Sequence, residues 1–81
     1  MPYVEQQVRE QLKGRSPRTA GELNFVITGL LLDYLPYKPS YSDYNEIVGV
    51  LESAKLEFYR RMVAEYEDEK IAANGDVYRR A

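Results

Sequence analysis

Residues 43–73 read DYNEIVGVLESAKLEFYRRMVAEYEDEKIAA, and this stretch decides the fold. Its apolar side chains recur at spacings of three and four: Tyr44, Ile47, Val48, Leu51, Ala54, Phe58, Met62 and Tyr66. Such a period is typical of an amphipathic α-helix. Ser40 or Ser42 provides an N-terminal cap, and Asn74-Gly75 provides a stop. We therefore predict one uninterrupted helix over residues 43–73.

The length of this helix has a direct consequence for assembly. Its thirty-one residues extend about 46 Å, whereas a compact monomer of this chain length is only about 30 Å across. The C-terminal end of the helix therefore needs to bend or to be covered by another subunit. We predict a homo-oligomer, most simply a twofold dimer, with three side chains of this end in the contact. They are Phe58, Met62 and Tyr66.

The first residues of the chain predict a short helix over 3–13. Apolar side chains recur there at every fourth position, namely at Val4, Val8 and Leu12. Gly14 follows, and we expect it to adopt the left-handed conformation that ends many helices. Pro17 cannot continue a helix, so the chain is expected to turn before the next element.

A second helix is predicted over residues 20–35. Thr19 stands three residues before Glu22, which is the spacing of a capping box. Pro36 ends the helix, because the residue before a proline disfavours helical geometry. Its apolar side chains cover most of its circumference: Leu23, Phe25, Val26, Ile27, Leu30, Leu31, Leu32, Tyr34 and Leu35. We expect a helix so apolar to be nearly surrounded.

These elements predict an all-α fold without strands. The short first helix is expected to accompany an antiparallel hairpin of the second helix and the long third one. We expect one helical domain over residues 1–81, with a short tail at 76–81 in which Val77 and Tyr78 return toward the helix. Self-association is expected to complete the fold.

Composition excludes several kinds of chemistry. The chain has 81 residues, a net charge of −2, and no Cys, His or Trp. Disulfides, Ser-His-Asp and Cys-His catalysis and zinc fingers are therefore excluded. We expect no catalytic site, no metal site and no cofactor, and the protein is predicted not to be an enzyme.

Charge and hydropathy limit the partners. Residues 1–20 carry a net charge of +2 and residues 21–59 a net charge of −4, which argues against general DNA binding. The longest apolar stretch, at 25–32, is far shorter than the roughly 20 residues that span a bilayer. The charged N-terminus does not resemble a secretory signal. We expect a cytoplasmic protein without a membrane partner.

Small and polar residues predict a ligand site between the two longer helices. Mid-helix glycine permits close approach, paired amides donate and accept hydrogen bonds, and tyrosines stack on planar ligands. Arginine provides bidentate contacts to an anionic group. The alternative is that the same residues only hold two helices together. The predicted site consists of Asn24, Thr28, Tyr41, Tyr44, Asn45, Gly49, Ser53, Arg60 and Arg61.

Two charged clusters each have two interpretations. Glu65, Asp68 and Glu69 share a helical face and suit either a divalent cation or a salt-bridged surface, of which the surface is the commoner case. The basic residues before the second helix suit either an anion or a solvated joint, and the joint is the more frequent case. These basic residues are Arg9, Lys13, Arg15 and Arg18.

Four segments carry a resemblance to a known family. They are 21–28 (GELNFVIT), 44–52 (YNEIVGVLE), 56–61 (LEFYRR) and 66–78 (YEDEKIAANGDVY). Together they resemble a family of short uncharacterised proteins found in bacteriophages and prokaryotes. The resemblance covers roughly residues 20–78, and the closing NGDVY is its most specific part. It implies a phage or prokaryotic setting and no particular activity.

Three functions follow as hypotheses. The first is a non-enzymatic phage-type accessory protein, an oligomer that sequesters a nucleotide-like ligand or blocks a host protein. The second is a structural or assembly protein. The third, which the missing His and Cys disfavour, is a metal-dependent module built on carboxylates. Its candidate residues are Glu22, Glu46, Glu52, Glu67 and Asp68.

Overall fold

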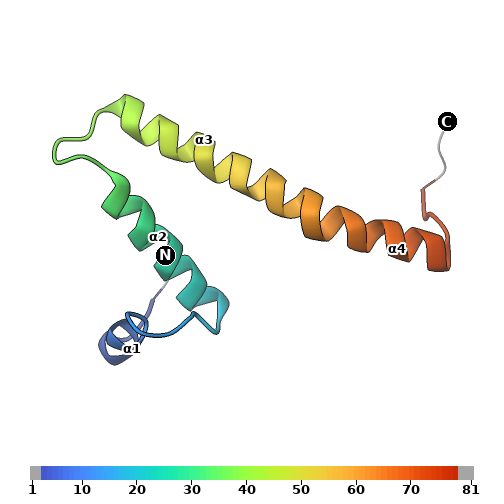
Figure 1. Cartoon of the computed structure of the whole chain (residues 1–81), viewed down its shortest axis with the longest axis horizontal. Coiled ribbons are helices and arrows are strands. Elements are labelled where there is room, and N and C mark those ends of the chain that lie inside the picture. Colours follow the sequence, from blue (N-terminus) through green and yellow to red (C-terminus); the bar gives the residue numbers. More distant parts are fainter. Residues whose placement is uncertain (1–2, 79–81) are drawn as a thin grey trace. The chain divides into compact units, whose positions relative to one another are not determined.

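The computed structural model describes residues 3–78, and helices dominate them (Figure 1). Residues 3–78 contain no strand, so the all-α prediction is confirmed, as is the order of a short, a medium and a long helical segment. The elements are α1 (Gln6–Gln11), α2 (Ala20–Tyr34), α3 (Tyr41–Phe58), the π-helical turn η1 (Tyr59–Val63) and α4 (Ala64–Asn74).

Contacts along the chain group into two units, one ending at Asp43 and one beginning at Tyr44. Each unit is described by itself below. The antiparallel packing of α2 on α3 and the single domain remain predictions.

In the first unit, α1 is shorter than the predicted helix over 3–13. Glu5 precedes the helix with an extended backbone, and its side chain makes no capping hydrogen bond. The helix ends at Gln11, and two tighter bonds follow: Lys13 N–H donates to the Glu10 carbonyl and Gly14 N–H to the Gln11 carbonyl, at 3.3 and 3.0 Å. These bonds satisfy the last carbonyls without a left-handed residue. The left-handed cap expected at Gly14 is therefore wrong, since Gly75 alone has a positive φ among residues 3–78.

Glu22 holds the corner between α1 and α2. The Thr19 hydroxyl accepts from the Glu22 N–H at 3.1 Å, as the capping-box spacing predicts. The Glu22 carboxylate turns to the preceding loop instead of to Thr19: its Oε1 accepts from Arg15 Nη1 at 2.8 Å and from the Arg18 N–H at 3.0 Å. The Arg15 and Glu22 side chains are only 21% and 15% exposed. One carboxylate thereby connects the joint to the first turn of α2.

The ends of α2 follow the sequence signals. Thr19 is its cap and extended, and Leu35 leaves the helix with an extended backbone, as a residue before a proline prefers. On the side toward α1, Phe25 and Gly29 are half-buried, as are Val8 and Leu12 of α1. The short helix thus covers part of one face of α2.

The long helical run begins at Tyr41, two residues earlier than predicted. Ser40 supplies the predicted cap: its hydroxyl oxygen accepts from the Asp43 N–H at 3.4 Å, and its backbone N–H donates to Asp43 Oδ2 at 2.8 Å. The carboxylate also lies in the first turn, where the helix dipole favours negative charge. From here α3 continues through η1 into α4 (Figure 1).

The prediction of an uninterrupted α-helical period is wrong at Tyr59–Val63, where the chain forms a π-helical turn. There the Ala64 N–H donates to the Tyr59 carbonyl, five residues back. A π turn holds about one more residue than an α-helical turn, so it rotates every later side chain relative to the earlier ones. Accordingly Val63 and Ala64 are half-buried at the turn, while Met62 is exposed.

Neither unit has a buried residue among those described. Folded domains normally bury their Leu, Ile, Val and Phe side chains, yet here even Leu30 and Leu32 of α2 are exposed. The nearly surrounded helix expected over 20–35 is therefore not found within its unit. The apolar faces of α2 and of the long helical run are therefore not covered within their own units.

The Glu22 contacts generate a pH prediction. Hydrogen bonds from Arg15 and then from the Arg18 N–H lower the pKa of Glu22. A lowered folded-state pKa stabilises the corner above the ordinary Glu value and loses that effect as pH falls through the folded pKa. We expect the NMR signals of α1 amides to shift toward those of unfolded chain on acidification, because six helical residues are marginal alone.

Glu22→Gln is expected to produce the same shifts already at pH 7. Glu10→Gln is the matched control, since Glu10 only pairs with Lys13 on an exposed surface. Equal spectra for Glu22→Gln and the native chain at pH 7 would contradict the role given to this carboxylate.

Candidate functional site

The predicted ligand residues on α2 bond to each other. The Thr28 hydroxyl donates to Asn24 Oδ1 at 3.0 Å, one helical turn away, and both side chains are exposed. Apart from its chain neighbours and the backbone of its own helix, no described atom lies within 4 Å of the position that a Cβ would take at Gly29. Gly29 is half-buried on the side toward α1, so it does not extend the exposed Asn24–Thr28 pair.

The predicted residues on α3 form a stripe along one side of that helix. Asn45, Gly49 and Ser53 follow one another at steps of four and are all exposed. Tyr41 and Tyr44 are exposed at the start of the same helix. Asn24 and Thr28 belong to the first unit, and the stripe belongs to the second. Their union in one site stays a prediction.

Arg60 and Arg61 both contact Glu57 on the exposed surface of the long helical run. Arg61 Nε lies 2.7 Å and Arg60 Nη2 3.2 Å from Glu57 Oε1. The hydrogen bonds from Arg61 and then Arg60 lower the pKa of Glu57. Two guanidinium groups share one carboxylate, so this cluster keeps a net positive charge at neutral pH.

Tyr59 and Glu67 connect the two sides of the π turn. The Tyr59 hydroxyl donates to Glu67 Oε1 at 2.6 Å, and this bond, with the negative charge of Glu67, raises the pKa of Tyr59. In an ideal α-helix residues eight apart lie about 80° apart around the axis. The extra residue of the π turn brings position 67 onto the face of position 59. Residues eight apart are not adjacent in an unbroken α-helix, which is why sequence reasoning missed this pair.

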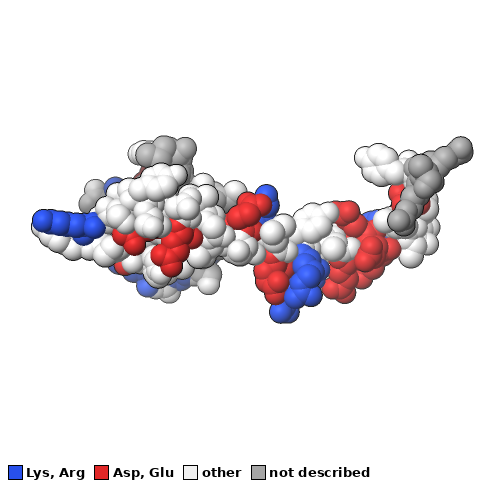
Figure 2. Space-filling view, turned by 90° about the horizontal axis from the view of Figure 1, so that it is seen from above, with Lys and Arg blue, Asp and Glu red and all other residues white. Residues whose placement is uncertain are grey.

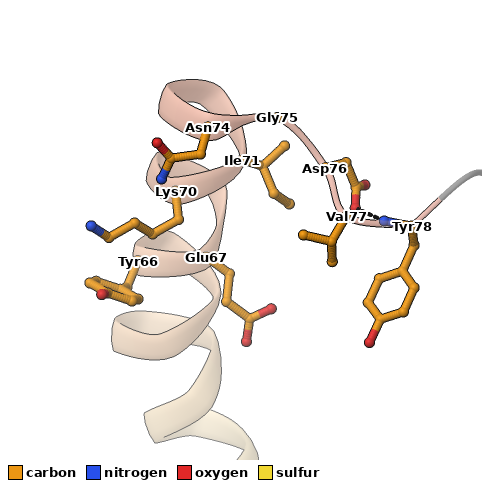
Figure 3. Close-up of a pocket in the computed structure, with 9 residues that line it drawn as sticks. All are labelled: Tyr66, Glu67, Lys70, Ile71, Asn74, Gly75, Asp76, Val77 and Tyr78. Carbon is orange, nitrogen blue, oxygen red and sulfur yellow. Dashed lines mark hydrogen bonds between the residues drawn. The ribbon is translucent and has the colours of Figure 1, made fainter.

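A hollow of about 300 Å³ lies where α4 ends (Figure 3). Gly75 has φ 83° and ψ 155°, a conformation open almost only to glycine, and its N–H bonds to the Ile71 carbonyl at 2.8 Å. The chain then turns beside the helix, and the Tyr78 N–H donates to Asp76 Oδ1 at 2.9 Å. The lining residues are Tyr66, Glu67, Lys70, Ile71, Asn74, Gly75, Asp76, Val77 and Tyr78.

This hollow joins apolar and charged side chains from one unit. Figure 3 shows Ile71 and Val77 on its two sides and the Glu67 carboxylate near its rim. The Lys70 ammonium lies 5.5 Å from the centre of the Tyr66 ring, within cation–π distance. Val77 and Tyr78 lie beside α4 as expected, yet both stay exposed. The Asn74-Gly75 stop was the sequence signal for this turn.

The other predicted clusters are placed as follows. Within residues 3–78, no three acidic side chains come together in a way that holds a metal ion, and Glu65, Asp68 and Glu69 are exposed. No helix among the described residues is both long enough and apolar enough to cross a membrane. Of the basic cluster, Arg15 pairs with Glu22, while Lys13 pairs with Glu10 at 3.0 Å. Phe58, Met62 and Tyr66 are exposed, and their contact with another subunit stays a prediction.

The chain belongs to the family described as a domain of unknown function, DUF6899, whose match spans residues 1–77. No curated protein and no solved structure matches the chain at a significant level. This match also includes the N-terminal helix, whereas the resemblance seen in the sequence covered only residues 20–78. Membership of a family without an assigned activity agrees with the coarser part of that resemblance.

The pair at the π turn generates a second prediction. Glu67→Gln removes the negative charge that raises the pKa of Tyr59, so we expect this pKa to fall toward the ordinary tyrosine value. Titration of the tyrosine ring carbons by NMR measures the change. Glu65→Gln is the matched control because Glu65 lies on the same acidic run without that bond. An unchanged Tyr59 pKa in Glu67→Gln would contradict the contact.

Proposed function

We propose that the chain is a non-enzymatic binding protein that works as an oligomer. The observation that supports the oligomer is a mismatch of helix lengths within one chain. The helical run from Tyr41 to Asn74 comprises 18, 5 and 11 residues, or 34 in all, whereas α2 has 15. At about 1.5 Å per residue these are roughly 50 Å and 22 Å long.

Because α2 is less than half as long as the run from Tyr41 to Asn74, it is too short to cover more than half of that run. A short loop joins Tyr34 to Tyr41, so a hairpin would place α2 against the N-terminal half of the run. The side chains predicted at the subunit contact lie beyond that reach, and they are 63%, 59% and 58% exposed at Phe58, Met62 and Tyr66. Burial of each such side chain stabilises by about 1.5–3 kcal/mol, which favours a second protein surface over water.

For the ligand we propose a nucleotide-like molecule. Tyr37, Tyr41 and Tyr44 are exposed within eight residues, and such rings stack on bases of any sequence. The Lys38 ammonium lies 6.0 Å from the centre of the Tyr37 ring, so this loop also carries positive charge beside an aromatic face. The arginine pair at 60–61 offers a second cationic group for an anionic ligand.

A host protein is the second candidate, and α2 supports it. Leu23, Ile27, Leu30 and Tyr34 follow one another at steps of four, three and four, and all are exposed within the first unit. That spacing is the seam by which helices pack on a partner helix. The resemblance to phage proteins favours a role as an accessory protein in the cytoplasm of an infected cell for either ligand.

The oligomer is tested by light scattering. At tens of micromolar protein, we expect a mass that is a whole multiple of the 9.4 kDa chain, twice that value in the simplest case. The mass should fall on dilution with a single midpoint, because association follows protomer concentration. A mass of one chain at this concentration would overturn the proposal.

The ligand is tested by calorimetric titration with mononucleotides and short oligonucleotides. Binding is expected to weaken at least tenfold in Asn45→Ala and in Arg60→Ala, with the circular dichroism spectrum unchanged, since loss of a charged hydrogen bond costs about 1.5–3 kcal/mol. Glu10→Gln serves as a control remote from these residues. The absence of binding heat with every nucleotide would overturn the nucleotide-like ligand and would leave a host protein as the remaining candidate. Loss of folding in both variants would overturn the predicted site.

A further inference from the structure

We propose that residues 55–70 form a twofold, antiparallel contact with the same residues of a second copy. The inference rests on the proposed function, because it names the surface through which the oligomer forms. It commits to a second copy of this chain as the occupant of the apolar face at the π turn.

The apolar side chains at the turn are self-complementary. Phe58 and Tyr66 stand four residues before and after Met62, and more than half of each of the three side chains is exposed. Because η1 holds about one extra residue per turn, a step of four there keeps side chains on one face. A twofold axis at Met62 sets Phe58 of each copy against Tyr66 of the other, as an isologous contact requires.

The charges give the contact its direction. Residues 55–61 hold Lys55, Arg60 and Arg61 against one acid, a net charge of +2. Residues 65–70 hold four acids against Lys70, a net charge of −3. Figure 2 shows the two signs gathered in neighbouring groups along this part of the molecule. In an antiparallel pair the basic block of each copy runs along the acidic block of the other, whereas a parallel pair sets like charges together.

The contacts within each chain leave these blocks able to pair. Arg60 and Arg61 share the single carboxylate of Glu57, and no ion pair within the described residues engages Glu65, Asp68 or Glu69. Exposed ion pairs contribute little to affinity by themselves. Here they select the orientation and the register, while the apolar face supplies the stabilisation.

Within its own unit this face is not covered, since Phe58, Met62 and Tyr66 are 63%, 59% and 58% exposed. The C-terminal hollow begins at Tyr66 and lies beyond Met62 along the run. α1 has six residues, and its Val8 and Leu12 are already half-buried in the first unit.

Single cysteines test the register, because the native chain has none. Under mild oxidation we expect Met62→Cys to form a disulfide-linked dimer. Phe58→Cys and Tyr66→Cys alone should stay uncrosslinked, and an equimolar mixture of the two should form a mixed dimer. In the proposed register, position 58 of one copy lies about 12 Å along the axis from position 58 of the other, too far for a disulfide.

Charge reversal provides an independent measurement that keeps the apolar face intact. The variant Arg60→Glu/Arg61→Glu is expected to raise the dimer dissociation constant about tenfold, and adding Glu65→Arg/Asp68→Arg to it should restore the native value to within about threefold. Lys13→Glu, in the first unit, is the matched control. Circular dichroism confirms that each variant remains helical.

The outcomes separate this inference from the proposed function. A native chain that stays monomeric overturns both. An oligomer in which Met62→Cys does not crosslink, or in which all three cysteine variants crosslink with themselves, overturns the antiparallel contact and leaves the oligomer standing. Failure of the second reversal to restore association, with helicity unchanged, likewise overturns the charge pairing between copies.

Discussion

A helical run of 34 residues against a helix of 15 is the constraint on which the remaining structure depends. Neither element buries its apolar side chains within its own unit, and a chain of about 80 residues has little core to offset that cost. The chain carries no disulfide, so covalent bridges do not compensate. Contacts near in sequence therefore stabilise the chain, and we propose that association adds to them.

The contacts near in sequence are concentrated where helices begin and end. Glu22 connects Arg15 and the Arg18 N–H to the first turn of α2, and Ser40 with Asp43 fixes the first turn of the long run. Each of these two sets of hydrogen bonds provides partners for polar groups at a helix terminus. They set where helices start, and they do not decide which faces meet. We propose that the exposed apolar stripes determine which faces meet.

The sequence predicted these termini because their signals are local. Thr19 before Glu22, Pro36 after Leu35 and Asn74-Gly75 each act through the geometry of a few bonds, and the structure places all three as expected. The prediction at Gly14 failed because two tighter hydrogen bonds, one of them donated by the Gly14 N–H, close α1 without a left-handed residue. The π turn was not predicted from the sequence, although the spacing of the apolar residues around it indicates one. Ala54, Phe58, Met62 and Tyr66 are separated by three consecutive steps of four, a period longer than the 3.6 residues of an α-helix.

The candidate site was harder to predict, because it depends on surfaces that the chain does not bring together within either unit. Asn24 bonds to Thr28 on α2, and Asn45 stands on α3 with its own exposed stripe. Side-chain types in a helical period identify a face, but they do not tell which surface that face meets. The Tyr59–Glu67 bond shows the same limit on a smaller scale, since a spacing of eight becomes adjacency only once the helix adds a residue.

The two proposals, assembly and ligand binding, are thermodynamically linked. If a ligand contacts side chains that only the assembled protein brings together, it binds the oligomer and not the separate chain, and it stabilises the oligomer by RT ln(1 + [L]/Kd). The same linkage works in reverse, because a contact that strengthens association raises the fraction of chains able to bind. Arg60 and Arg61 belong to both proposals: they stand in the predicted ligand site and in the basic block at the π turn. A change at either residue therefore acts on affinity for the ligand through two routes, and the dependence of binding on protein concentration separates them.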